Sequence, residues 1–157
     1  MKKNNILGIL SFLSLILGYA GITRILSAGE SLVSNMVNLP AGFPTPAGLR
    51  IIWAFLFLLW GIGSFFVYSV NLTPRRKRNI FLNSLILVVV IFTWNYLVFS
   101  AANFSGALAI AIAAFLLSLV VWFMYLVIHR YGGYLFTPMM IWSVYMLYLS
   151  IALVARN

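Results

Sequence analysis

The sequence predicts an all-α integral membrane protein, a bundle of five transmembrane helices with a long first loop. One observation is a set of five long apolar stretches, and another is a composition that is 64% hydrophobic with a single acidic residue. A helix advances about 1.5 Å per residue, so about 20 apolar residues cross a hydrocarbon layer about 30 Å thick. We expect one domain over residues 1–157, with spans at Ile6–Leu26, Ile51–Val70, Ile80–Phe99, Gly106–Ile128 and Leu135–Val154.

The first span follows two lysines and therefore also resembles a secretory signal. The apolar core of such a signal is usually about 7–15 residues long. Here the apolar run continues past Gly21, so we expect a retained first helix.

Small residues recur at helical spacing in the first and fourth spans, and such faces let neighbouring backbones approach closely. Two interpretations stay open, packing inside the bundle and a homodimer interface. The residues are Ser11, Ser14, Gly18 and Gly21 in the first span, and Ala107, Ala111, Ala114 and Ser118 in the fourth.

The first loop, Ser27–Leu49, contains Pro40, Pro44 and Pro46. Proline fixes φ and lacks an amide hydrogen, so we expect this loop to be extended rather than helical. It could be a lid over a cavity or a compact connector. The last two connections are short, which favours antiparallel contacts among the last three spans.

The net charge of +9 could suggest nucleic acid, but most of the cations flank apolar spans, as in membrane proteins. One side of the membrane would hold Lys2, Lys3, Arg75, Arg76, Lys77, Arg78 and Arg130, and the other Arg24, Arg50 and Arg156 with Glu30. Because cytoplasmic loops are enriched in cations, we expect a cytoplasmic N-terminus and an external C-terminus. We expect the lipid bilayer as a partner, in a prokaryotic cell membrane, and no nucleic acid.

Catalytic and metal chemistry have little support in this sequence. Glu30 has no second carboxylate for acid–base catalysis, and His129 is the only histidine in a chain without cysteine. No charged residue lies near the middle of a span, which argues against an ion-coupled carrier. We therefore predict no catalytic residues, no metal site and no required cofactor.

Aromatic residues are the remaining signal. Trp53, Phe57 and Trp60 share one face of the second span, and Trp94 and Trp142 lie within the third and fifth. Tryptophan gathers at membrane interfaces, but Trp60 would lie near the middle of the bilayer. This pattern leaves two interpretations open, ordinary packing and a wall for a flat apolar ligand.

Several segments together resemble the tryptophan-rich sensory protein/translocator protein family, also called TspO/MBR or peripheral benzodiazepine receptor-like. The matching segments are residues 40–44 (PAGFP), 53–64 (WAFLFLLWGIGS), 94–99 (WNYLVF) and 133–142 (GYLFTPMMIW). The resemblance implies a five-helix bundle, often a homodimer, with a pocket under the first loop that binds porphyrin or haem. The matching positions that would line the pocket are Trp53, Phe57, Trp94, Asn95, Trp142 and Met146, with Pro44 in the lid.

We therefore expect a membrane receptor or carrier for a hydrophobic planar molecule such as a tetrapyrrole. The alternative is a structural or assembly subunit without a small-molecule ligand, because the family's lid tryptophans are replaced by Gly42 and Ala47. Porphyrin degradation is implied by the resemblance alone, and the shortage of ionisable groups argues against it.

Overall fold

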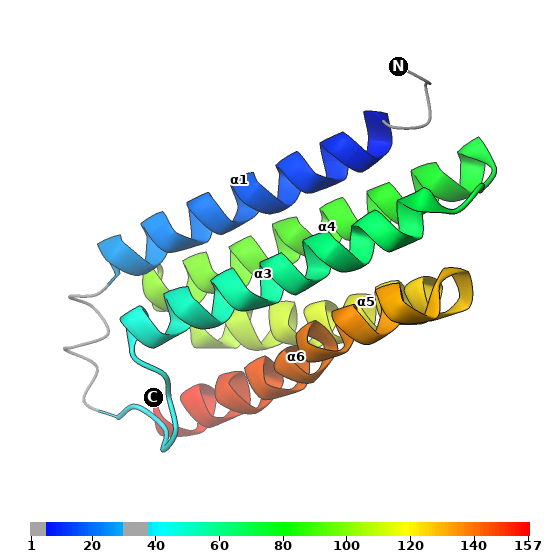
Figure 1. The fold of residues 1–157 in the computed structure, drawn as a ribbon. Helices are drawn as coiled ribbons and strands as arrows, with labels where there is room; N and C mark the ends of the chain where they lie inside the picture. The colour runs from blue at the N-terminus through cyan, green and yellow to red at the C-terminus, as the bar shows by residue number, and fades with distance from the viewer. Residues whose placement is uncertain (1–5, 30–37) are drawn as a thin grey trace.

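The computed structural model describes residues 6–29 and 38–157, and in these ranges the secondary structure is helical, with no strands (Figure 1). The expectations for Lys2, Lys3 and Glu30, and for the full length of the first loop, fall outside the described residues. The five predicted spans are confirmed, and each helix is long and apolar enough to cross a membrane. The helices are α1 (Ile6–Ala28), α3 (Pro46–Ser69), α4 (Pro74–Phe99), α5 (Phe104–Ile128) and α6 (Arg130–Arg156).

Three helices, α3, α4 and α6, begin five or six residues before their predicted starts, because their first turns contain proline, glycine or charged residues rather than an apolar run. The Thr45 and Thr73 hydroxyls accept hydrogen bonds from the amides of Gly48 and Arg76 and cap α3 and α4, and each cap is followed by proline in the first turn. Proline suits that position because its missing amide hydrogen would have no helical partner there. The prediction that the first loop stays extended as far as Leu49 is therefore wrong for its last residues, which form the start of α3.

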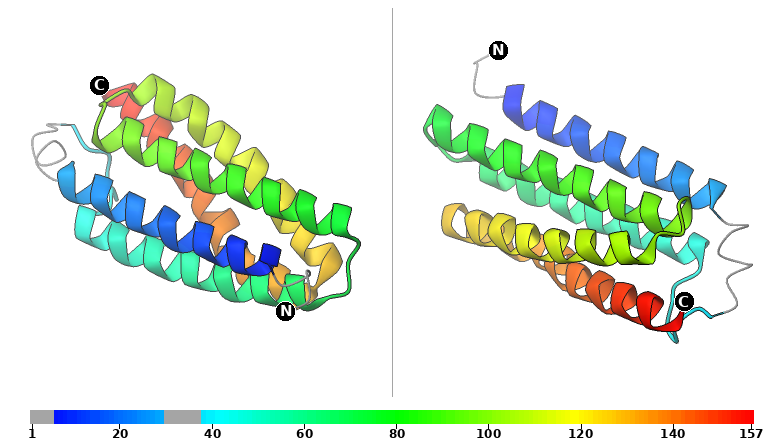
Figure 2. Two further views of the ribbon diagram at one scale, coloured as in Figure 1. Left: turned by 90° about the horizontal axis from the view of Figure 1, so that it is seen from above. Right: turned by 180° about the vertical axis from the view of Figure 1, so that it is seen from behind.

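The five helices form a closed ring. Helix α1 packs against α3 and α4, α6 packs against α3 and α5, and α4 packs against α5 (Figure 2). The predicted contacts between consecutive helices among the last three spans are thus confirmed. Ile6 and Asn157 lie at opposite ends of the bundle, and we call these the Ile6 end and the Asn157 end (Figure 1).

The two faces of small residues lie inside this ring. A Cβ atom at Gly18 would be 2.6 Å from Cγ1 of Val88 on α4, so these two helices are in direct contact there. Ala107, Ala111 and Ala114 are buried, and the Ser118 hydroxyl is 2.7 Å from that of Ser143 on α6. Both faces therefore pack within the bundle, and a homodimer would have to use another surface.

Helices α3 and α6 come into backbone contact at a pair of glycines. A Cβ atom at Gly63 would lie 2.9 Å from the carbonyl oxygen of Gly132, and one at Gly132 would lie 3.0 Å from the carbonyl oxygen of Gly63. Since the neighbouring atoms are backbone, they cannot turn aside as a side chain could. Both positions therefore require glycine at this helix spacing.

Large apolar side chains also cover the outside of the bundle. Leu17, Ile51 and Phe65 are each more than 70% exposed. An apolar exterior of this extent is stable against acyl chains rather than water. The fold is that of an integral, multi-pass membrane protein.

Candidate functional site

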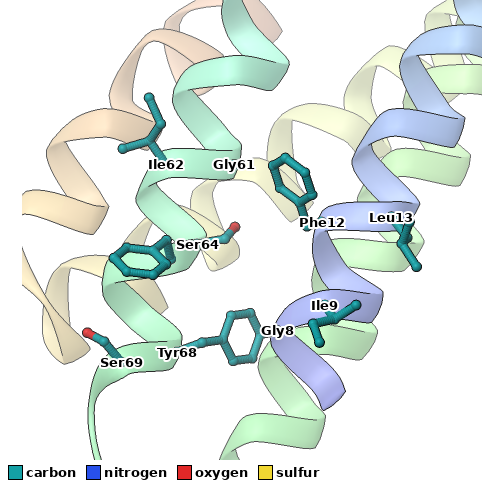
Figure 3. Close-up of a pocket in the computed structure, with 10 residues that line it drawn as sticks. Gly8, Ile9, Phe12, Leu13, Gly61, Ile62, Ser64, Tyr68 and Ser69 are labelled. Atoms are coloured by element: carbon teal, nitrogen blue, oxygen red, sulfur yellow. The ribbon is translucent and has the colours of Figure 1, made fainter. Parts of the chain in front are cut away.

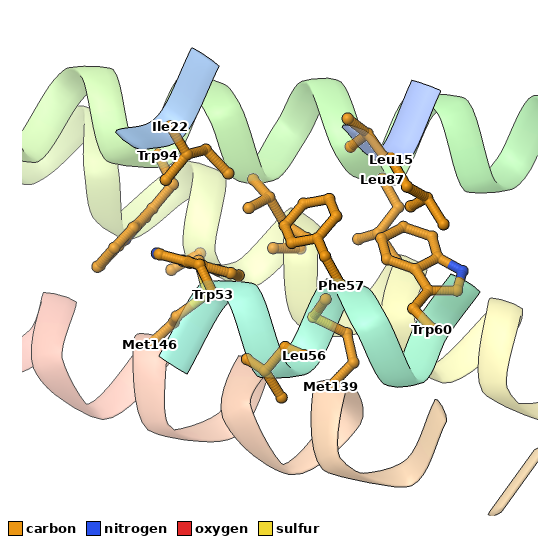
Figure 4. Packing of buried hydrophobic residues seen from close by; sticks show 14 of the residues in the cluster. Leu15, Ile22, Trp53, Leu56, Phe57, Trp60, Leu87, Trp94, Met139 and Met146 are labelled. Atoms are coloured by element: carbon orange, nitrogen blue, oxygen red, sulfur yellow. The ribbon is translucent and has the colours of Figure 1, made fainter. Parts of the chain in front are cut away.

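The aromatic face predicted on α3 points into the bundle. Trp53 and Trp60 are fully buried, and Phe57 lies between them with ring-centroid distances of 6.0 Å and 5.7 Å (Figure 4). Their spacing along the helix places all three on the side that meets the other helices. The interpretation of these rings as lipid-facing residues is therefore excluded for α3.

Trp142 of α6 packs against this cluster. Its ring meets Trp53 edge to face, with centroids 6.0 Å apart and planes at 82°. This is a favoured geometry for aromatic pairs because the positive edge of one ring faces the negative face of the other. Met146, one turn further along α6, is buried beside Trp53 (Figure 4).

Trp94 and Asn95 reach the interior from α4, and both are fully buried. The Trp94 Nε1–H group donates a 2.8 Å hydrogen bond to the Ser150 hydroxyl on α6. The Asn95 Nδ2 group donates to the carbonyl of Ile91 in its own helix at 2.9 Å. Trp94 therefore ties α4 to α6, whereas Asn95 is held only by its own helix.

Three buried polar atoms in this region have no hydrogen-bond partner among the described residues. They are Nε1 of Trp53, Nε1 of Trp142 and Oδ1 of Asn95. Leaving such a group unsatisfied costs about 1–3 kcal/mol. A ligand with one or more polar atoms would recover part of that cost. The two donors and the one acceptor are therefore candidates for ligand recognition.

The segment Asn38–Thr45 crosses the Asn157 end of the bundle, and we call it the strap. The Tyr145 hydroxyl donates a 2.6 Å hydrogen bond to the carbonyl of Gly42, and Arg156 Nη1 donates a 3.1 Å bond to that of Leu39. Phe43 also packs on Phe99 with centroids 6.1 Å apart. Gly42 has φ of +83°, a backbone conformation that glycine adopts at no steric cost.

A groove of about 510 Å³ lies beside the strap, between α3 and α6. Its walls are apolar, and they include Pro44 and Trp142 of the predicted site. The residues that line it are Pro44, Ile52, Leu56, Pro138, Ile141, Trp142 and Tyr145. Ligand pockets commonly have volumes of about 300–1,000 Å³, so the groove is of suitable size.

The structure therefore divides the predicted site into two connected parts. In the interior, Trp53, Phe57 and Met146 pack together, and Trp94 and Asn95 reach the same region from α4. Pro44, in contrast, lines the groove. Trp142 belongs to both parts, because it contacts Trp53 and also lines the groove.

Sequence reasoning did not identify the strap contact of Tyr145 or the pairing of Ser150 with Trp94. Tyr145 lies three residues after Trp142 and therefore on the same helix face, and this spacing is a signal from which Tyr145 could have been predicted as a site residue. No pattern along the chain marks Ser150, because its partner lies 56 residues away.

A second polar cluster was also missed, and it surrounds the buried Tyr125 of α5. Its hydroxyl accepts a 3.2 Å hydrogen bond from Nε1 of Trp60 and lies 2.8 Å from the Ser64 hydroxyl and 3.4 Å from that of Ser84. The cluster connects α3, α4 and α5. Trp60 therefore has a structural partner, unlike Trp53.

Comparison with known proteins agrees with this geometry. The model of the TspO/MBR family matches residues 10–156, which include most of α1 and the whole of the other four helices. The comparison with curated proteins found no match. Because the match extends over nearly the whole chain and the fold is a bundle of five membrane-spanning helices, the protein belongs to the TspO/MBR family.

Proposed function

We propose that this protein is a membrane receptor or carrier for a hydrophobic planar small molecule, a tetrapyrrole such as porphyrin or haem. The observation that carries the proposal is the pair Trp53 and Trp142, which are in edge-to-face contact while neither indole N–H group has a hydrogen-bond partner among the described residues. Indole rings offer apolar faces for stacking, and their N–H groups can donate to a ligand. Membership of the family supports a role in ligand binding or transport.

The ligand would first bind in the groove beside the strap. Trp142 is half-buried and forms the wall between the groove and the interior, so its rotation would open the way to Trp53. The strap would then close over the ligand through Tyr145. Burial of one aromatic ring is worth about 1.5–3 kcal/mol before the cost of ordering, so a few such contacts suffice for micromolar affinity.

Charge at the Asn157 end suits a tetrapyrrole with carboxylate side chains. Arg24 precedes the end of α1, Arg50 lies in the first turns of α3, and Arg156 ends α6 beside the strap. Ligand carboxylates would lie near them while the macrocycle lies against the tryptophans.

The direct test is titration of protoporphyrin IX into the detergent-solubilised protein, followed by quenching of tryptophan fluorescence. We expect saturable binding that is weakened by at least tenfold in both Trp53→Ala and Trp142→Ala. Trp122→Ala is the matched control, since Trp122 is half-buried and hydrogen-bonded to Thr137, and neither residue lines the groove. Binding that is equal in all three variants would exclude this site.

A structural or assembly subunit without a ligand is the second candidate, and the filled interior favours it. Trp53 and Trp94 are fully buried by the protein's own side chains. Gly42 in the strap and Ala47 in the first turn of α3 stand where the family it resembles has tryptophan. This function predicts no saturable binding of tetrapyrroles and instead co-purification with a defined membrane partner.

We further propose that the Ile6 end faces the cytoplasm of a prokaryotic cell. Among the described cations, Arg75, Arg76, Lys77, Arg78 and Arg130 lie at this end. Alkaline phosphatase fused after Asn157 should be active, because that enzyme folds only outside the cytoplasm, whereas green fluorescent protein at the same position should be dark. The reverse result would invert the orientation.

A further inference from the structure

A second cavity lies between α1 and α3 near the Ile6 end, away from the strap and the aromatic site. Its volume is about 730 Å³, larger than that of the groove beside the strap (Figure 3). The residues that line it are Gly8, Ile9, Phe12, Leu13, Gly61, Ile62, Ser64, Phe65, Tyr68 and Ser69.

Two glycines keep this space open. A Cβ atom at Gly8 would meet only Tyr68, at 3.6 Å, and one at Gly61 would meet the Phe12 ring at 3.4 Å. Larger residues could therefore be accommodated at both positions, in contrast to Gly63, which lies two residues after Gly61. The two helices contact each other here without filling the gap between them.

The cavity has the dimensions and the opening expected for an acyl chain. From Gly61 to Ser69 the helix rises about 12 Å, close to half of a hydrocarbon layer about 30 Å thick. Its rim consists of side chains on the lipid-facing surface, since Ile9 and Phe65 are 46% and 72% exposed. An occupant would therefore enter from one leaflet of the bilayer.

The interface between α1 and α3 also contains buried polar groups. The hydroxyls of Tyr68 on α3 and Ser11 on α1 are near each other, but neither makes a hydrogen bond of good geometry among the described residues. Tyr68 reaches from α3 toward α1 at the foot of the cavity (Figure 3).

The mouth of the cavity lies at the most positive end of the bundle. Helix α3 ends at Ser69 and α4 begins at Pro74, followed by the exposed Arg75, Arg76 and Arg78. Lys77 between them is only 4% exposed. No acidic side chain occurs among the described residues, so none of them neutralises these cations.

We propose that this cavity binds one acyl chain of an anionic phospholipid from the leaflet at the Ile6 end, with the phosphate on the arginines at the start of α4. The apolar lining, the depth of one leaflet and the unneutralised cations at the mouth all match that class of lipid. The site is distinct from the proposed tetrapyrrole site and does not depend on it.

The test is native mass spectrometry of the purified full-length protein with added phosphatidylglycerol or phosphatidylcholine of identical acyl chains. We expect one tightly retained phosphatidylglycerol, bound at least tenfold more tightly than phosphatidylcholine. Ile9→Trp should fill the cavity and weaken phosphatidylglycerol binding about tenfold. Ile16→Trp is the matched control, since Ile16 lies on the same helix, is similarly exposed and does not line the cavity.

Two further variants separate the acyl-chain site from general charge attraction. Gly8→Leu should weaken binding as Ile9→Trp does, and melting curves show whether each variant is folded. Arg75→Gln/Arg76→Gln should reduce the preference for phosphatidylglycerol over phosphatidylcholine. Wild-type binding in both folded cavity variants, or equal retention of the two lipids by the wild-type protein, would overturn the proposal.

Discussion

The hydroxyl of Tyr145 donates a 2.6 Å hydrogen bond to the carbonyl of Gly42, a residue 103 positions earlier in the chain. This contact holds the strap on the helix that also carries Trp142. The strap and the wall of the groove are therefore linked. Opening the strap would break this hydrogen bond, the hydrogen bond from Arg156 to Leu39 and the contact of Phe43 with Phe99.

Tyr145→Phe should increase the rate at which a bound tetrapyrrole dissociates. A hydrogen bond of this kind contributes about 0.5–1.5 kcal/mol, which corresponds to roughly 2–10-fold. Stopped-flow measurement of protoporphyrin IX release checks the prediction. Tyr148→Phe is the control, because Tyr148 stacks on Tyr145 but is half exposed and lies outside the groove; equal rates in both variants would show that the strap does not retain the ligand.

Asn95→Leu should weaken protoporphyrin IX binding without lowering the melting temperature. The Asn95 side chain is buried, and its Oδ1 atom has no hydrogen-bond partner among the described residues, so an apolar side chain of similar size removes an unsatisfied group. Asn83→Leu is the matched control, because Asn83 also donates to the carbonyl four residues earlier in α4 but is less buried. Unchanged affinity in Asn95→Leu, measured by fluorescence titration, would remove Asn95 from the site.

Tyr125→Phe should destabilise the bundle by about 1–3 kcal/mol. The change removes the acceptor of Trp60 Nε1 and the hydroxyl shared with Ser64 and Ser84, leaving buried polar groups unpaired. Thermal unfolding in detergent, followed by circular dichroism, should show a lower melting temperature. Tyr96→Phe, at a half-exposed position on α4, should leave it unchanged, and a similar loss in both variants would contradict the assigned role of the cluster.

Gly63→Ala should be strongly destabilising, whereas Gly61→Ala should be neutral or slightly stabilising. The new methyl group at residue 63 would meet the Gly132 carbonyl oxygen at 2.9 Å, so α3 and α6 would have to separate. At residue 61 it would meet the edge of the Phe12 ring at 3.4 Å, and alanine favours the helix by about 1 kcal/mol over glycine. Melting temperatures of the two variants check this, and equal values would show that the glycine contact does not set the helix spacing.

Helix positions were predictable to within about one to two turns because crossing the bilayer demands an uninterrupted apolar run, which can be read locally. The starts of α3, α4 and α6 were predicted too late for a local reason as well. Their first turns contain proline, glycine or charged residues and are capped by Thr45, Thr73 and His129, and hydropathy does not register such turns.

The sequence by itself determined that the chain crosses the membrane five times and that Trp53, Phe57 and Trp60 lie on one face of a helix. Only the tertiary structure decided that this face points inward, that Trp142 meets Trp53, and that Tyr145 holds the strap. The physical reason is that helix formation and insertion depend on neighbouring residues, whereas the side chains that meet between helices depend on how the ring closes. Glycine contacts such as that of Gly63 with Gly132 fix this closure, and they join residues far apart in the chain.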